Sequence, residues 1–185
     1  MPIAQNPLPR PQDRARFSRR TSRVLVVDED HHILLFLDSD LGVEPVPHWW
    51  MTPGGGVDPG EDDHIAAARE LDEETGLVLP PSEIFGPIAL RRVTHGYSDV
   101  IVEQEEVFFG VRVARFDPSP RGYTEDEAAC IVEQRWVPRR GLDALAEPVW
   151  PASLATIWDH WDDMVAHPTL PHLDLPDTEE SVIPV

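Results

Sequence analysis

Residues 69–77 read RELDEETGL, and four of the first six positions in this stretch are acidic. The stretch follows HIAAA, a segment of helix-forming residues, and Gly76 favours a helix end. On a helix Glu70 lies three residues from Glu73 and four from Glu74, so the three carboxylates share a face. Each like-charge pair costs about 0.3 kcal/mol, and the C-terminal end of a helix is already negative. Local energetics oppose this arrangement, which indicates that something else favours it.

A bound divalent cation would explain the acidic face. Mg²⁺ is held by a few carboxylates together with waters and substrate phosphates, and its charge turns the repulsion into attraction. Immediately upstream, TPGGGVDPGE carries three successive glycines at 54–56, where the backbone can come close to a ligand. The pattern predicts a metal–pyrophosphate site, in which the loop supplies close approach and a carbonyl ligand and the helix supplies charge.

Composition limits the class of protein. The chain has 185 residues, of which 41% are apolar, which suits one domain with extensions. No run approaches the roughly 18–20 apolar residues of a membrane span, and the first twenty residues contain no apolar core of a secretory signal. The single cysteine excludes an internal disulfide framework and a cysteine zinc site. We therefore expect a cytoplasmic protein without a membrane partner.

The net charge of −19 disfavours nucleic acid as a partner, since the 15 Lys and Arg residues are scattered and polyanion binding needs clustered basic residues. An acidic surface also repels a free phosphorylated metabolite unless divalent cations reverse the local sign. We expect a small nucleotide as substrate and no nucleic acid.

Hydrophobic patterning predicts a mixed sheet covered by helices on both faces. A flexible arm is expected over residues 1–20, a folded domain over 21–167 and a Pro-rich tail over 168–185. Within the domain we expect strands over 22–30, 31–39, 83–96, 99–117 and 131–139, a helix over 62–75 and an acidic loop over 119–129. A second helix is predicted over 152–166, with Leu154, Ile157, Trp158, Trp161 and Val165 on its apolar stripe.

The spacing of the acidic stretch resembles a known motif. Gly55, five residues, Glu61, seven residues and then RELDEETGL are similar to the complete Nudix box, from Gly55 to Leu77. The long pattern with fixed gaps makes a chance match very improbable. The resemblance implies an α/β fold of the Nudix type, an α/β/α sandwich around a mixed β-sheet. It also implies hydrolysis of a nucleoside diphosphate linked to another group.

Carried over by position, the resemblance assigns roles within the box. Glu70 and Glu74 are the expected principal ligands of Mg²⁺, for which Mn²⁺ is a possible substitute, and Glu73 is a further ligand or a partner through water. The carbonyl of Gly54 is similar to a backbone ligand in relatives. Arg69 is expected to orient the glutamates through charge-assisted hydrogen bonds. Structural roles fall to Glu61, which anchors the loop onto the helix, and to Gly55 and Gly76.

The general base is less determined by the motif. In many relatives it lies in a mobile loop before the last strand, which here reads TEDEAA and offers Glu125, Asp126 and Glu127. We choose Glu127 and keep Glu70 or Glu73 as the alternative. In either case water activated by the metal attacks phosphorus and a carboxylate takes the proton.

Three residues outside the box are candidates for substrate binding. Trp50 has an aromatic face on which a base can stack, although a core role suits a large aromatic residue better. Arg91 and Arg92 are adjacent in a predicted strand and point to opposite faces. One of them is a candidate to reach a substrate phosphate, and surface ion pairing is at least as good an interpretation.

Two functions fit these residues. The first is an active pyrophosphohydrolase that acts on a small nucleotide such as an NTP, ADP-ribose or a sugar nucleotide. The alternative is a catalytically silent module that senses nucleotides, which the intact set of box glutamates disfavours. Either form is compatible with a homodimer in which the arm and the tail wrap the partner.

Overall fold

A computed structural model describes residues 10–185, apart from the side chains of residues 126 and 127. Its strands are β1 Ala15–Val27, β2 His32–Ser39, β3 His48–Met51, β4 Gly54–Gly56, β5 Phe85–Gly96, β6 Val100–Arg112, β7 Glu133–Pro138, β8 Val149–Trp150, β9 Leu173–Asp174 and β10 Thr178–Glu179. Its α-helices are α1 Asp63–Thr75, α2 Glu125–Cys130 and α3 Leu154–Ala166. Short 3₁₀ turns occur at Pro11–Asp13, Pro81–Glu83 and Arg139–Ala144.

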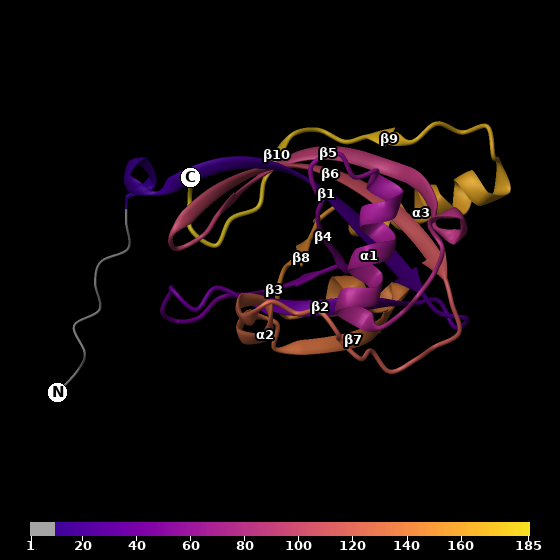
Figure 1. Ribbon diagram of the computed structural model, residues 1–185, viewed down its shortest axis with the longest axis horizontal. Coiled ribbons are helices and arrows are strands. Elements are labelled where there is room, and N and C mark those ends of the chain that lie inside the picture. Colours follow the sequence, from indigo (N-terminus) through magenta and orange to yellow (C-terminus); the bar gives the residue numbers. More distant parts are fainter. Residues whose placement is uncertain (1–9) are drawn as a thin grey trace.

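The strands form one mixed sheet in the order β10-β5-β6-β1-β2-β3-β8, with β4 on β1, β7 on β2 and β9 on β5. β1 and β6 run parallel over all 13 residues of β1, from Ala15 opposite Val100 to Val27 opposite Arg112. Figure 1 shows that the sheet curls, so that β5 and β6 lie in an upper layer and β2, β3 and β7 in a lower one. α1 stands in front of the opening between the layers.

Alternation along β1 divides the core into two parts. Val24 and Val26 face one side, where they belong to the cluster that contains Ala67 and Leu71 of α1. Leu25 and Val27 belong to the other cluster, into which α3 inserts its apolar stripe of Leu154, Ile157, Trp158, Trp161 and Met164. Helices therefore cover both faces of a mixed sheet, and the predicted α/β/α sandwich is confirmed.

Several predicted elements need correction. The segment expected as an acidic loop contains a helix, α2, which short-range patterning did not indicate. In α3, Val165 is 53% exposed and Met164 is buried in its place, since the stripe turns by one position along the helix. β1 begins at Ala15, so residues 15–20 of the predicted arm belong to the sheet.

The C-terminal segment is also built into the fold. Leu173 pairs with Ala89 and Thr178 pairs with Val93, so the predicted tail adds two short parallel strands to the edge of β5. In the described part of the chain, the helices are too short or too polar to cross a membrane.

The close approach of β6 to α3 generates a prediction. A Cβ atom on Gly110 would lie 2.5 Å from Cε2 of Trp161, whose ring is buried. We expect Gly110→Ala to lower the free energy of unfolding by about 1–3 kcal/mol, because overpacking a rigid core forces side chains off their rotamers. Urea denaturation measures the change. Gly56→Ala is the matched control, since its added Cβ would meet nothing within 4 Å; equal midpoints for the two variants would contradict the prediction.

Candidate active site

α1 begins and ends as its sequence predicts. The Asp62 side chain accepts a hydrogen bond from the His64 amide at 2.9 Å and caps the first turn. Gly76 has a φ of 73°, the left-handed conformation that glycine adopts without strain, and its amide donates to the Asp72 carbonyl. The box helix is thereby fixed at both ends.

A loop also covers the C-terminal end of α1. The carbonyl of Glu73 accepts hydrogen bonds from the amides of Arg121 and Gly122 at 2.8 and 3.0 Å. The carbonyl of Thr75 accepts one from the amide of Ser119 at 2.9 Å. These amides satisfy carbonyls that would otherwise add to the negative end of the helix.

Arg69 holds the box together. Its guanidinium donates to both carboxylate oxygens of Glu61, with Nε–Oε1 at 3.0 Å and Nη2–Oε2 at 2.8 Å. It also donates to Oε1 of Glu70 at 2.8 Å, to Oε2 of Glu73 at 3.1 Å and to the carbonyl of Gly56 at 2.8 Å. The hydrogen bond from Arg69 lowers the pKa of Glu61, and the carboxylates raise the pKa of Arg69. One cation thus neutralises part of the acidic face and ties the loop to the helix.

The glycine loop packs directly on two glutamates. The amide of Gly54 donates to Oε2 of Glu74 at 2.7 Å. A Cβ atom on Gly55 would lie 2.7 Å from the carboxylate of Glu70, so only glycine leaves room there for that carboxylate. Glu70 and Glu74 are 7% and 6% exposed, and burial raises the pKa of Glu70 even though Arg69 opposes the shift.

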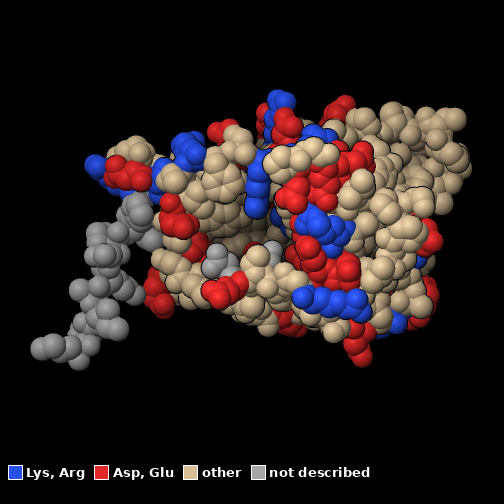
Figure 2. Space-filling model, viewed as in Figure 1, with Lys and Arg blue, Asp and Glu red and all other residues tan. Residues whose placement is uncertain are grey.

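A cavity of about 610 Å³ lies against this arrangement. Glu70, Glu74 and the loop Gly54–Gly56 form one part of its lining, and Arg19 and Arg23 of β1 form another. Trp49 of β3 and Tyr97, which follows β5, contribute aromatic surface. In Figure 2 the molecule is hollowed beside the red and blue side chains that gather over α1. The pocket therefore combines buried carboxylates, guanidinium groups and aromatic rings.

The three glutamates that were predicted as metal ligands do not all face this cavity. Glu70 and Glu74 line it, whereas in the described part of the chain Glu73 lies outside the lining and beside Arg69. Its side chain is 42% exposed. The carbonyl of Gly54 accepts a hydrogen bond from Nη1 of Arg23 at 2.6 Å, which orients the group predicted as a backbone ligand.

Trp50 is not where a substrate contact requires it. Its side chain is fully buried in the core that contacts α3, and its indole donates to Oε2 of Glu147 at 3.1 Å. Alternation along β3 places the neighbouring Trp49 at the cavity instead. Trp49, and not the predicted Trp50, therefore lines the cavity, because the sequence does not say which face of this short strand is buried.

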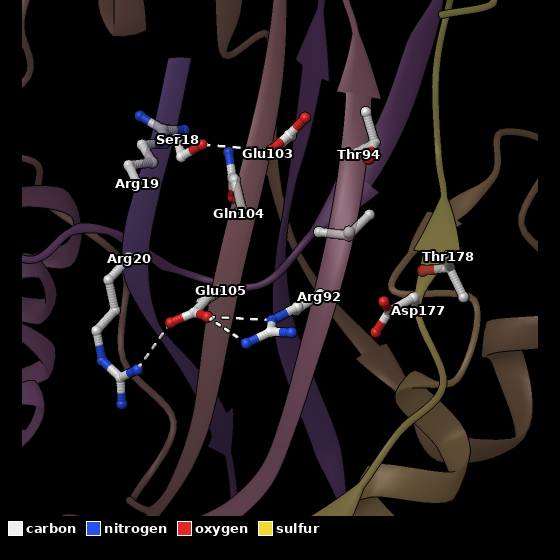
Figure 3. Close-up of a pocket in the computed structure, with 11 residues that line it drawn as sticks. Ser18, Arg19, Arg20, Arg92, Thr94, Glu103, Gln104, Glu105, Asp177 and Thr178 are labelled. Atoms are coloured by element: carbon white, nitrogen blue, oxygen red, sulfur yellow. Dashed lines mark hydrogen bonds and ion pairs between the residues drawn. The ribbon is translucent and has the colours of Figure 1, made fainter.

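Arg91 and Arg92 point to opposite faces, as predicted. Arg91 is buried and pairs with Glu106 at 2.6 Å, away from solvent. Arg92 is exposed and donates to Glu105 at 2.9 Å in a separate groove of about 510 Å³ on the outer face of the sheet. Figure 3 shows Arg20 reaching the same carboxylate from β1. Neither arginine lines the cavity beside the box. Each is held by an ion pair on its own face of β5, Arg91 by Glu106 and Arg92 by Glu105.

The predicted base, Glu127, belongs to α2, and its side chain lies outside the described residues. The end of α2 borders the cavity through Ala129 and Cys130. The site residues that the sequence analysis missed are Arg19 and Arg23. The signal for both is the alternation of residues 17, 19, 21 and 23 on one face of β1. The assignment of residues 1–20 to an arm concealed it at Arg19, whereas Arg23 lay in the predicted strand over 22–30 and was not considered as a site residue.

The donors at the cavity suit Mg²⁺. They are oxygen atoms of two carboxylates and a carbonyl, with space kept open by Gly55, and magnesium takes oxygen ligands. Among the described residues, groups of three acidic, histidine or cysteine side chains that could enclose an ion are absent. Because Mg²⁺ usually binds one or two carboxylates and completes its shell with waters and substrate phosphates, this smaller donor set fits.

Comparisons with known proteins give a family match. The family model of the NUDIX domain matches residues 17–156. The chain is 53% identical over 131 residues to the RNA pyrophosphohydrolase of Rhodopseudomonas palustris (strain BisB18), a match that covers 62% of this chain and 72% of that protein. A match of 52% identity over 46 residues covers 24% of this chain but only 27% of the RNA pyrophosphohydrolase of Nitrobacter winogradskyi.

Solved structures show the same fold. The MutT protein from Bacillus halodurans superposes with a TM-score of 0.52 at 20% sequence identity, over 86% of this chain and 90% of that one.

The contacts of Arg69 predict its role in stability. We expect Arg69→Lys to lower the free energy of unfolding by about 1–2 kcal/mol, because an ammonium cannot reproduce the two-pronged pairing with Glu61 while also reaching Glu70 and Gly56. Urea denaturation at neutral pH measures the change. The matched control is Arg92→Lys, whose parent side chain is 71% exposed beside Glu105 and which should change stability by less than about 0.5 kcal/mol. Equal losses in both variants would refute the central position of Arg69.

Proposed function

The chain belongs to the NUDIX family, hydrolases that act on pyrophosphate bonds, and on this premise we propose that it hydrolyses a nucleoside diphosphate derivative with the help of Mg²⁺. The observation that carries the proposal is the placement of Glu70 and Glu74. Both carboxylates are buried at the cavity and are held against the glycine loop by Arg69 and the Gly54 amide. Mg²⁺ is usually bound by one or two carboxylates and completes its shell with waters and substrate phosphates, so two carboxylates held at one cavity support a cation site.

We propose that Glu70, Glu74 and the carbonyl of Gly54 hold the ion, with Glu73 as a further ligand through water. The chemistry that bound Mg²⁺ supplies is charge neutralisation on the pyrophosphate and a lower pKa of the attacking water. Arg69 keeps Glu70 oriented, and Arg23 keeps the Gly54 carbonyl oriented. Arg19, on the same face of β1, is placed to approach phosphate oxygens.

Glu127 is the base that we propose, because α2 borders the cavity. Glu73 is less suited, since its carboxylate lies outside the lining of the cavity. Glu70 stays the alternative within the box.

A small nucleotide is the substrate class that we propose first. The cavity volume of about 610 Å³ falls in the range of small-molecule sites, and the net charge of −19 disfavours long polyanions. The names of the relatives support a second candidate, the 5′ pyrophosphate end of an RNA, for which only the terminal nucleotide need enter the cavity. The silent sensor is disfavoured because every box glutamate is present. The homodimer and the cytoplasmic location stay predictions.

The test is turnover of a substrate panel. NTPs, dNTPs, ADP-ribose, sugar nucleotides, dinucleoside polyphosphates and a 5′-triphosphorylated RNA oligomer are incubated with Mg²⁺, and products are resolved by chromatography. We expect one class to be hydrolysed and Glu74→Gln to lower kcat/KM about 100-fold or more, because metal ions contribute several kcal/mol to such reactions. Asp72→Asn is the matched control, since Asp72 lies on the same helix with a half-exposed side chain that pairs with Arg121.

The two outcomes separate the functions. Turnover that is lost in Glu74→Gln and kept in Asp72→Asn supports the hydrolase and names its substrate. A wild-type protein that gains thermal stability from millimolar Mg²⁺ but turns over nothing in the panel would favour the sensor.

A further inference from the structure

The C-terminal segment lies along the free edge of β5 (Figure 1). After β10, the amide of Glu180 donates to the carbonyl of Thr94 at 3.0 Å, and the amide of Val182 donates to that of Gly96 at 3.1 Å. The hydroxyl of Ser181 accepts from the amide of Gly96 at 2.8 Å. The segment is therefore hydrogen-bonded at successive positions on both sides of Glu180, which fixes where that side chain enters the protein.

Glu180 turns inward from this edge. Its side chain is 9% exposed, and Oε2 lies 2.9 Å from Nη1 of Arg91, which is 2% exposed. Its other oxygen, Oε1, accepts from the amide of Ala152 at 2.8 Å. The carboxylate thus connects the C-terminal segment to a buried arginine that the proposed chemistry does not use.

From Arg91 a line of alternating charges leads to the site. Nε of Arg91 donates to Oε2 of Glu106 at 2.6 Å, and Oε1 of Glu106 lies 3.4 Å from Nε of Arg23. Nη1 of Arg23 donates to the carbonyl of Gly54 at 2.6 Å. Arg91, Glu106 and Arg23 are all less than 10% exposed. Two carboxylates and two guanidinium groups therefore balance in charge between the C-terminal segment and the glycine loop.

The position of Arg23 depends on how Glu106 is shared. Glu106 offers one oxygen to each arginine, and Glu180 engages the Nη1 group of Arg91. Without the charge of Glu180, Arg91 is free to pair with both oxygens of Glu106, the geometry that guanidinium and carboxylate groups prefer. Arg23 would then lose its carboxylate partner while buried beside Glu70, Glu74 and Gly54. An unbalanced positive charge at that place repels a cation, and a mobile Arg23 no longer orients the Gly54 carbonyl.

We propose that Glu180 is a positioning residue of the active site, which acts through Arg91 and Glu106 on Arg23 and the Gly54 carbonyl to favour binding of the divalent cation. The inference rests on the proposed metal site, and it assigns a role in cation affinity to the C-terminal segment, 126 residues after Gly54. Both consequences of losing Glu180, the excess charge and the loose carbonyl, weaken cation binding.

The experiment measures Mn²⁺ affinity of the full chain by titration with electron paramagnetic resonance of the free ion. We expect Glu180→Gln to weaken Mn²⁺ binding about tenfold and to raise the metal concentration for half-maximal turnover by a similar factor. Glu179→Gln, a substitution at the exposed neighbour on β10, should stay within about twofold of wild type. Thermal unfolding is recorded for each variant, because a merely structural role would lower the melting temperature without changing the Mn²⁺ affinity of the folded protein.

A double variant tests the route through Arg91. In Arg91→Gln/Glu180→Gln the remaining Glu106 and Arg23 balance each other, so Mn²⁺ affinity should return to within about threefold of wild type. If Glu180→Gln alone does not fold, an Mn²⁺ affinity of the folded double variant that is more than about threefold weaker than that of wild type would overturn the proposal. Unchanged Mn²⁺ affinity in folded Glu180→Gln, or a double variant no better than the single one, would overturn the proposal.

Failure of this inference is distinguishable from failure of the proposed function. An active wild-type enzyme with unchanged Mn²⁺ affinity in Glu180→Gln would refute only the role of Glu180. A wild-type protein that binds Mn²⁺ but hydrolyses nothing would refute only the hydrolase, since the affinity comparison still stands. A wild-type protein that does not bind Mn²⁺ would refute both.

Discussion

The contacts of Arg69 are the interaction on which the site depends. A helix end with four acidic residues is unfavourable by itself, because like charges repel and the helix dipole adds to them. Arg69 reaches three of the nearby glutamates and one loop carbonyl at the same time. Its planar guanidinium has enough hydrogen-bond donors for all of these contacts. The position therefore depends on arginine itself and not only on a positive charge. The loop and the helix are then one unit, and the remaining carboxylates can be presented to a cavity.

Close packing of the loop is the second constraint. Gly55 lies so near the Glu70 carboxylate that any side chain would displace it, and the Gly54 amide faces Glu74. The loop therefore cannot move away from the helix without losing the hydrogen bond from Gly54 to Glu74 and the close packing of Gly55 on Glu70. The spacing between Gly55 and Glu70 in the sequence is fixed because the chain needs that length to place the glycine loop over the acidic face of the helix.

Much of the fold and of the box was predictable from the sequence, because local residues determine it. The bounds of α1 follow from Asp62 and Gly76, and the sandwich follows from apolar stripes and alternation. Long-range pairing determines the rest. Trp49 and Trp50 are equivalent in sequence, and only the packing of β3 distinguishes them. Arg19 was hidden because the pairing of residues 15–20 with β6 comes from a strand more than eighty residues away. The edge strands of the C-terminal segment depend likewise on β5, which its Pro-rich composition does not reveal.

The charge pattern around the cavity supports a need for a cation. The negative net charge of the chain suggests that its whole surface repels a pyrophosphate. The cavity wall nevertheless contains a positive charge, that of Arg23. Its guanidinium is already matched by Glu106 and the Gly54 carbonyl. Arg91, the next cation along, is matched by Glu106 and Glu180. Arg23 and Arg91 therefore mainly hold neighbouring groups in place, and they add little positive charge that a pyrophosphate could use. A pyrophosphate placed beside Glu70 and Glu74 would face two buried carboxylates, so a divalent cation between them is the simplest way to reverse the local sign.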